Sequence, residues 1–329
     1  MTTTFSRRAA LGGLGASLLA TPAARAQTGD WPNRSVKFVC GYPPGGSTDA
    51  FTRAYGDYLA QHYKQPFVVE NKTSAGSIIA CEIVARAAPD GYTFLFTNST
   101  ALFANKVTYK KLPYDPDKDL VPVSLMPAGH LPMYVHKSVP AKTIPEFVAW
   151  AKTTKVNFGT YGAGSVAHIT CATFNNVHGL SMQPVHYRGE GPMWADINGG
   201  VVHAAVGSYQ AASAAMQAGN AIPIAVPTTT RMKRKLLHVP TFHEQGATHP
   251  YFLLQGLVGC LAPAGTPRPI VEAVSNLMVE AGKTPRIQAL LEQFGIDDAA
   301  QDWREFERYF REDGPLLVKA VKELGLDPI

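Results

Sequence analysis

The sequence predicts an α/β fold in which strands and helices alternate. Short apolar runs typical of buried strands recur along the chain, and amphipathic runs typical of helices separate them. Several of these strands run directly into loops that contain glycine and hydroxyl residues, followed by a helix. With 329 residues, 46% of them hydrophobic, the chain is long enough for two domains of ordinary size.

The first 26 residues have the features of an export signal. Ser6-Arg7-Arg8 precedes a short apolar run from Leu11 to Ala20, and Ala24-Arg25-Ala26 has the Ala-x-Ala form of a cleavage site. The paired arginines favour the twin-arginine export route. The apolar run is too short to span a bilayer. We therefore expect cleavage after Ala26 and a mature protein that begins at Gln27 and resides in the periplasm.

Charge argues against a nucleic-acid partner. The export segment contains Arg7, Arg8 and Arg25 and no acidic residue, so its removal lowers the formal net charge from +5 to +2. Most of the positive excess is thus accounted for by targeting. No later apolar run has the length of a membrane span. We expect a soluble extracytoplasmic protein.

The four cysteines, Cys40, Cys81, Cys171 and Cys260, are widely spaced. No Cys-x-x-Cys pair or histidine cluster accompanies them, which argues against a zinc or iron–sulfur site. Each lies in or beside an apolar run, so we expect buried free thiols. A single disulfide is the alternative that an exported location permits, and the sequence cannot choose its pairing. We expect neither a metal nor another cofactor.

One strand-to-helix turn organises the N-terminal third. The strand Val36–Cys40 runs into Gly41-Tyr42-Pro43-Pro44-Gly45-Gly46-Ser47-Thr48-Asp49, and a helix is predicted from Ala50 to Tyr63. The glycines allow a sharp turn, and Ser47 or Thr48 is expected to cap the helix. Unpaired backbone N–H groups and the helix dipole would then hold an anion. The alternative is an ordinary tight turn.

A second loop is expected at the same edge of the sheet. A strand at 67–71, a helix at 76–88 and a strand at 92–97 follow, and the last strand ends in Asn98-Ser99-Thr100. Alternating strands and helices predict βαβ units and a parallel sheet. Ligands bind beyond the carboxyl ends of such strands, so the two loops should converge on one site.

A crossover to a second domain is predicted after the proline-rich turn Leu112–Asp119. Thr143 is expected to cap a helix, with Pro145 in its first turn. The stretch Val156–His168 then repeats the first pattern of strand, glycine-containing loop and helix, the helix running over 165–177. A second helix N-terminus is thus available for an anion.

The rest of the chain continues the alternation. Strands are predicted at 120–126, 133–136, 182–185, 201–206, 222–226 and 253–261, and helices at 191–198, 209–218, 269–281, 285–294 and 303–324.

Enzymatic function is the main alternative to binding, and the motifs argue against it. Gly162-x-Gly164-x-x-Ala167 fits part of a dinucleotide fingerprint, but no acidic residue follows the next strand to hold a ribose. Gly-x-Ser-x-Gly is absent. Ser165 and His168 lie on one helix, where a third group cannot easily orient the imidazole.

Five ordered motifs carry a resemblance to a known family. They are Pro43-Pro44-Gly45-Gly46-x-x-Asp49, Ala87-Ala88-Pro89-Asp90-Gly91-Tyr92-Thr93, Lys111-Leu112-Pro113-Tyr114-Asp115-Pro116-x-Lys118-Asp119, Gly162-x-Gly164-Ser165-x-x-His168 and Leu261-Ala262-Pro263-Ala264-Gly265-Thr266-Pro267. Together they resemble the Bug-type extracytoplasmic solute receptors, the binding proteins of tripartite tricarboxylate transporters.

The resemblance implies a fold and a function. The fold is a two-domain periplasmic binding protein of type II, the Venus-flytrap kind, with a hinge between one domain of residues 27–127 plus 228–329 and another of residues 128–227. The function is capture of a small carboxylate, an aliphatic di- or tricarboxylate or an aromatic one, and delivery to the membrane components of the transporter. A monomer is expected. Presentation of the ligand to a signalling protein is an alternative, as is an exported enzyme.

The resemblance also implies the ligand-binding residues. They are Tyr42, Pro44, Gly45, Gly46, Ser47, Asp49, Asn98, Ser99, Thr100, Thr160, Tyr161, Gly162, Gly164, Ser165, His168, Tyr187, Arg188, Ser208 and Tyr209. Within this set, Asp49 would repel an anion, so holding the loop is its expected role. His168 is expected to pack, and Arg188 is the cation best placed for a second carboxylate.

The sequence departs from the family pattern at two places. Asn71–Gly76 lacks the usual Arg-Pro-Gly, and Gly199–Ala204 lacks an acidic residue that many relatives carry. The resemblance therefore does not predict which ligand groups these two segments would contact. An aromatic lining is expected from the following residues, which favours aromatic carboxylates as an alternative: Tyr42, Phe103, Tyr161, Tyr187, Trp194 and Tyr209.

Overall fold

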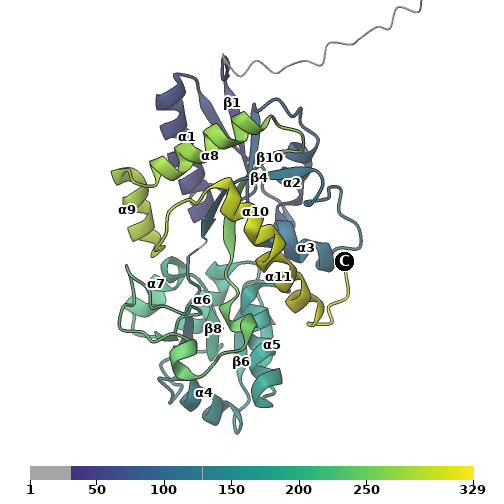
Figure 1. Ribbon diagram of the computed structural model, residues 1–329. Helices are drawn as coiled ribbons and strands as arrows, with labels where there is room; N and C mark the ends of the chain where they lie inside the picture. The colour runs from purple at the N-terminus through teal and green to yellow at the C-terminus, as the bar shows by residue number, and fades with distance from the viewer. Residues whose placement is uncertain (1–30, 128) are drawn as a thin grey trace, which may run out of the picture. The chain divides into compact units, whose positions relative to one another are not determined.

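The computed structural model describes residues 31–127 and 129–329, and two mixed five-stranded sheets lie within them (Figure 1). The first sheet has the order β2-β1-β3-β10-β4. Its strands are β1 (Val36–Cys40), β2 (Phe67–Asn71), β3 (Thr93–Asn98), β4 (Leu120–Pro127) and β10 (Leu257–Pro263). Strand β1 pairs in parallel with β2 and β3, as the sequence predicts, while β10 inserts antiparallel between β3 and β4.

The second sheet repeats this plan with the order β7-β6-β8-β5-β9. Its strands are β5 (Met133–His136), β6 (Asn157–Thr160), β7 (Gln183–His186), β8 (Ala204–Val206) and β9 (Ala221–Ala225). Strand β6 is parallel to β7 and β8, and β5 is antiparallel to β8 and β9. The chain thus enters the second sheet after β4 and returns after β9, so the first sheet combines N-terminal and C-terminal segments.

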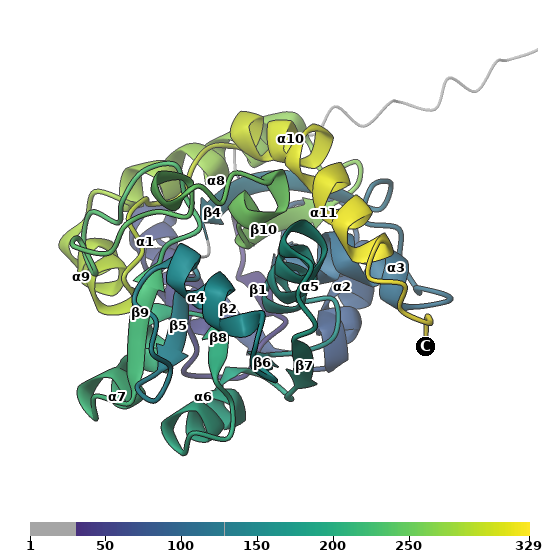
Figure 2. The same ribbon diagram turned by 90° about the horizontal axis from the view of Figure 1, so that it is seen from below.

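Helices pack on both sheets, and Figure 2 shows those around the second one. Their bounds are α1 (Ser47–Tyr63), α2 (Ile78–Ala85), α3 (Asn105–Thr108), α4 (Ile144–Ala151), α5 (Val166–His178), α6 (Glu190–Asn198), α7 (Tyr209–Gln217), α8 (Arg268–Ala281), α9 (Pro285–Phe294), α10 (Trp303–Arg311) and α11 (Asp313–Lys322). Helices α1, α2 and α8 contact the first sheet, and α5, α6 and α7 contact the second. Residues from Pro32 to Ile329 form one compact unit.

Three element predictions are wrong. The strand expected at 201–206 is confined to Ala204–Val206. The single helix expected at 303–324 is two helices that meet at Glu312, because Pro315 lacks an N–H and its ring clashes with the carbonyl four residues earlier. The strand expected at 253–261 begins only at Leu257, since Pro250–Leu253 form a 3₁₀ turn. The predicted cap of the fourth helix is confirmed, because the Thr143 hydroxyl accepts the Glu146 N–H.

The four cysteines are buried and unpaired, as expected. The predicted signal, residues 1–26, with its twin-arginine motif and cleavage site, lies outside the described residues. In the described part of the chain, no helix has the length and apolar character needed to cross a membrane.

Candidate functional site

Loops from both sheets enclose a cavity of about 170 Å³. From the first sheet come the start of α1, the end of β3 and the start of β10. From the second come the loop after β6 and the starts of α6 and α7. The lining residues are Ser47, Thr48, Asn98, Ser99, Thr100, Ala104, Leu131, Tyr161, Gly164, Val166, Glu190, Ser208, Gly256, Leu257, Val258 and Leu317.

Helix α1 begins at this cavity without a side-chain cap. Its cap position falls on Gly46, and Ser47 and Thr48 are already helical, so the expectation that one of them caps the helix is wrong. Among the described residues, the backbone N–H groups of Ser47, Thr48 and Asp49 have no hydrogen-bond acceptor; the first helical bond runs from Ala50 N–H to Gly46 oxygen at 2.9 Å. Three free donors and the positive end of the helix dipole are suited to hold an anion.

Asp49 holds the loop that precedes α1. Its carboxylate accepts the Gly45 N–H at 3.0 Å and the Asn71 amide at 2.8 Å, and it forms an ion pair with Arg53 at 2.9 Å. Burial would raise the pKa of Asp49, but the hydrogen bonds from Arg53, Asn71 and Gly45 together lower it. The charge is therefore neutralised within the loop, and the side chain does not line the cavity.

The end of β3 forms the neighbouring wall. Asn98 Oδ1 accepts the Thr100 N–H at 2.9 Å, and a short π-helix, Thr100–Ala104, follows. Tyr42 lies behind this wall: burial raises the pKa of its hydroxyl, and hydrogen bonds with Thr97 and Asn98 oppose that shift. Tyr42 therefore supports Asn98 and does not itself line the cavity.

The N-terminus of α5 differs from that of α1 because a serine side chain caps it. Ser165 caps the helix by accepting the His168 N–H at 3.3 Å. Burial raises the pKa of the Tyr161 hydroxyl, and the backbone N–H groups of Val166 and Ala167 oppose that rise. At the predicted second anion site, the cap thus takes the His168 N–H, and Tyr161 and Val166 line the cavity.

His168 lies behind the same loop and is 8% exposed. Its Nδ1 accepts the Gly164 N–H at 3.2 Å, and its ring lies 4.5 Å from the ring of His186. Burial, together with His186, lowers the pKa of His168 to about 4. The imidazole is therefore neutral at neutral pH and offers no charge to an anion.

Glu190, the first residue of α6, is a lining residue that the sequence analysis missed. Its Oε2 accepts the Trp194 indole N–H at 3.0 Å and both the N–H and the hydroxyl of Ser208 at 2.9 Å. Burial raises the pKa of Glu190 despite these three bonds. A sequence signal existed, since Gly189-Glu190-Gly191 follows β7 at another strand-to-helix turn.

The structure brings seven predicted site residues to the cavity: Ser47, Asn98, Ser99, Thr100, Tyr161, Gly164 and Ser208. The others do not line it: Tyr42, Pro44, Gly45, Gly46, Asp49, Thr160, Gly162, Ser165, His168, Tyr187, Arg188 and Tyr209.

Three of the residues that do not line the cavity contact other residues or solvent. The Tyr187 hydroxyl donates to Asp196 at 2.6 Å, and Arg188 is exposed. Tyr209 packs beside Gly295, where a Cβ would lie 3.2 Å from its ring.

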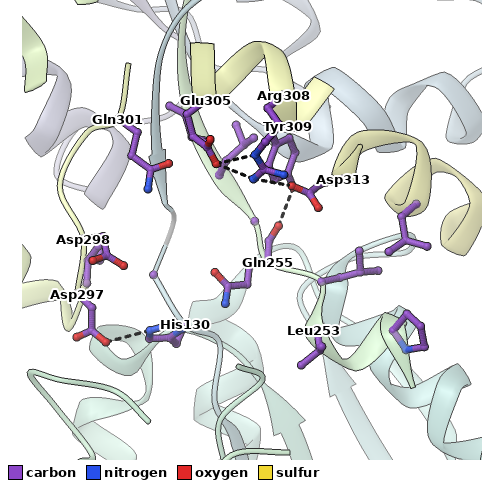
Figure 3. Close-up of a pocket in the computed structure, with 18 residues that line it drawn as sticks. His130, Leu253, Gln255, Asp297, Asp298, Gln301, Glu305, Arg308, Tyr309 and Asp313 are labelled. Carbon is purple, nitrogen blue, oxygen red and sulfur yellow. Dashed lines mark hydrogen bonds and ion pairs between the residues drawn. The ribbon is translucent and has the colours of Figure 1, made fainter. Parts of the chain in front are cut away.

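A second cavity, of about 460 Å³, shares Gly256 and Leu257 at the start of β10 with the first one (Figure 3). Its charged and titratable lining residues are His130, Asp297, Asp298, Glu305, Arg308, Tyr309 and Asp313. Arg308 pairs with Glu305 at 2.6 Å and with Asp313 at 3.4 Å, so it is already neutralised. The lining thus contains four carboxylates and one arginine that is already in ion pairs, so this cavity is unsuited to an anion. No cluster of His, Cys, Asp or Glu in residues 31–127 and 129–329 could hold a metal ion.

Most of the chain matches a known protein family. Residues 51–326 match the model of the tripartite tricarboxylate transporter family receptor. BugT of Bordetella pertussis is 30% identical over 272 residues, which cover 82% of each chain.

Two solved structures are similar throughout. A Rhodopseudomonas palustris protein with adipate is 28% identical, with a TM-score of 0.78, over 91% of this chain and all of that one. A structure described as a periplasmic transporter is 30% identical, with a TM-score of 0.76, over 89% of this chain and 98% of its own. The chain therefore belongs to the tripartite tricarboxylate transporter receptors, a family of solute-binding proteins and not of enzymes.

Proposed function

We propose that this protein captures a small carboxylate in the 170 Å³ cavity and delivers it to the membrane components of a tripartite tricarboxylate transporter. The uncapped start of α1 is the observation that carries the proposal. Two of its three free N–H groups, those of Ser47 and Thr48, belong to residues that line the cavity, and hydrogen bonds from such donors to a carboxylate are stronger than neutral ones.

The size of the cavity limits the ligand. At ~30 Å³ per water molecule, 170 Å³ corresponds to about six waters. A small aliphatic acid or a compact aromatic acid fits this volume better than a bulky one. The similar Rhodopseudomonas palustris structure holds adipate, which supports an aliphatic carboxylate.

The cellular setting is part of the proposal. The sequence of residues 1–26 supports twin-arginine export with cleavage after Ala26, and a similar structure is described as a periplasmic transporter. We infer that the mature protein acts in the periplasm as a monomer. The two sheets support two domains that close on the ligand around a hinge. Phe242, Ala247 and Phe252 pack in the core of the second sheet, so we place the return to the first domain after them and not at residue 228.

Thermal unfolding with a panel of carboxylates tests the proposal. A ligand at 100 times its dissociation constant adds about 2.7 kcal/mol to the stability of the native state and raises the unfolding midpoint. Aliphatic mono-, di- and tricarboxylates and benzoate are compared with nucleosides and neutral sugars. A shift with at least one carboxylate supports the proposal, whereas shifts only with neutral compounds reject it.

A variant locates the binding to α1. Ser47→Asp adds a negative charge at the first position of the helix, where acids favour helix formation, but the new carboxylate competes with the ligand for the same donors. The matched control is Thr143→Asp, an acid at the start of α4, which does not line the cavity. The rise in the unfolding midpoint that the ligand causes should vanish in Ser47→Asp and persist in Thr143→Asp. Retention of the shift in both variants would place the ligand elsewhere.

A further inference from the structure

Glu190 fixes one of its carboxylate oxygens with hydrogen bonds and leaves the other without a donor from the described residues. Oε2 accepts three hydrogen bonds, from Trp194 Nε1 and from the N–H and hydroxyl of Ser208. Oε1 accepts none from the described residues, and it is not among their buried unpaired atoms. Because Glu190 lines the cavity, Oε1 is available to a ligand.

The surroundings of Glu190 form a tight socket. A Cβ on Gly207 would lie 2.8 Å from Glu190 Oε2 and 2.8 Å from the Trp194 ring, so only glycine leaves room for the carboxylate. Trp194 in turn packs edge-on against Tyr134 at 5.0 Å, and Tyr134 is fully buried. A solvent-exposed acid in the first turn of α6 would stabilise the helix dipole equally well. Helix stabilisation alone thus does not explain a carboxylate held in this socket.

Glu190 also occupies the donors that a second ligand carboxylate would need. The N–H and hydroxyl of Ser208, at the start of α7, both donate to Oε2. Among the described lining residues there is no lysine, arginine or histidine, and Glu190 is the only acid. A dicarboxylate bound by one end at α1 would therefore bring its other end to a wall that carries negative charge and no free cation.

We propose that Glu190 makes the site select monocarboxylates whose other end carries a hydrogen-bond donor, an ammonium group above all, and reject dicarboxylates. The start of α1 holds the ligand carboxylate, and Glu190 Oε1 accepts from the donor. The assignment rests on the proposed function, because it takes the α1 end as the carboxylate site. It deepens that function by naming the substrate class.

Isothermal titration with two matched series tests the assignment. The four-carbon series is butyrate, γ-aminobutyrate, succinamate and succinate, and the six-carbon series is caproate, ε-aminocaproate, adipamate and adipate. In at least one series, wild-type protein should bind the ammonium and amide compounds at least tenfold more tightly than the dicarboxylate. This ranking needs no variant, so it stands even if a substitution impairs folding.

Glu190→Gln keeps the shape of the side chain and removes its charge. It should tighten dicarboxylate binding at least tenfold and weaken ammonium binding at least tenfold. Glu272→Gln on α8, at a side chain that is 42% exposed, makes the same change in net charge away from the cavity and should leave the ranking as in wild type.

Three results overturn the assignment, and they differ from failure of carboxylate capture. If wild-type protein binds the dicarboxylate as tightly as the matched amide, or if Glu190→Gln leaves their ratio unchanged, Glu190 does not select and carboxylate capture stands. The same holds if only benzoate or a tricarboxylate binds. If no compound of either series binds to wild type or variant, and no carboxylate of the thermal panel shifts the unfolding midpoint, carboxylate capture itself fails, and the role of Glu190 fails with it.

Discussion

Ser208 gives both of its donors to one oxygen of Glu190: its backbone N–H and its hydroxyl each lie 2.9 Å from Oε2. The same hydroxyl caps α7 by accepting the Ala211 N–H at 3.4 Å. One serine thus joins the start of α7 to the start of α6. The orientation of Glu190 in the cavity depends on this link.

Removing the Ser208 hydroxyl should destabilise the protein. Ser208→Ala loses the cap and one hydrogen bond to a carboxylate, and caps and charged hydrogen bonds are each worth about 1–2 kcal/mol. We expect a loss of about 2 kcal/mol in urea unfolding, with recovery in Ser208→Thr. In a double-mutant cycle, the loss should be smaller in a Glu190→Gln background. Equal losses in both backgrounds would show that the hydroxyl acts only as a cap.

Gly207 should tolerate no side chain. In Gly207→Ala, the new Cβ meets Glu190 Oε2 and the Trp194 ring at 2.8 Å, and overpacking of this kind costs about 1–3 kcal/mol. Gly191→Ala in α6 is the matched control, because a Cβ there meets nothing within 4 Å and alanine favours the helix. Chemical denaturation should show a loss at Gly207 and no loss at Gly191. Similar stability of both variants would mean that Glu190 and Trp194 can move aside at little cost in free energy.

The sequence predicts elements well where local signals are strong. Strands β1, β2 and β5 and helix α9 have the predicted bounds, since apolar runs end there in turn residues. The antiparallel insertion of β10 could not be predicted, because pairing between segments about 160 residues apart depends on tertiary contacts. The break at Glu312 was predictable from Pro315 and was missed.

The site residues also divide into those that local sequence signals predict and those that they do not. The loops at Ser47, Ser99 and Gly164 were found because strand-to-helix turns lie at the carboxyl edge of a sheet. Which helix start has a side-chain cap could not be predicted. Both α1 and α5 begin with hydroxyl residues, and only the backbone conformation puts Ser165 at the cap position and Ser47 inside the helix. Glu190 was missed because an acid was not expected in an anion site.

Dicarboxylate binding should strengthen as the pH falls. Burial raises the pKa of Glu190, so acid protonates it above the usual range of a glutamate and removes its repulsion of a second carboxylate. Tyr134 and Tyr161, the titratable groups that interact with Glu190, have pKa values raised by burial and stay neutral. Titration of succinate and adipate from pH 7 to pH 5 measures the effect. Protonation of the ligand itself affects wild type and Glu190→Gln equally. As the pH falls, the affinity should therefore change more favourably in wild type than in Glu190→Gln. Equal changes in affinity would contradict the prediction.

His168 should make the protein sensitive to acid. Its pKa is lowered to about 4 in the folded state, mainly by burial, whereas an unfolded histidine titrates near 6.5. The unfolded state therefore binds more protons between these values, and stability is lost as the pH falls from about 6.5 through about 4. Between pH 7 and pH 5 this residue should account for a loss of about 2 kcal/mol in urea unfolding. His168→Gln should show a correspondingly smaller loss, and the exposed His62→Gln should lose as much as wild type. If His168→Gln follows wild type through this pH range, His168 is not held neutral by the fold, and the acid sensitivity has another source.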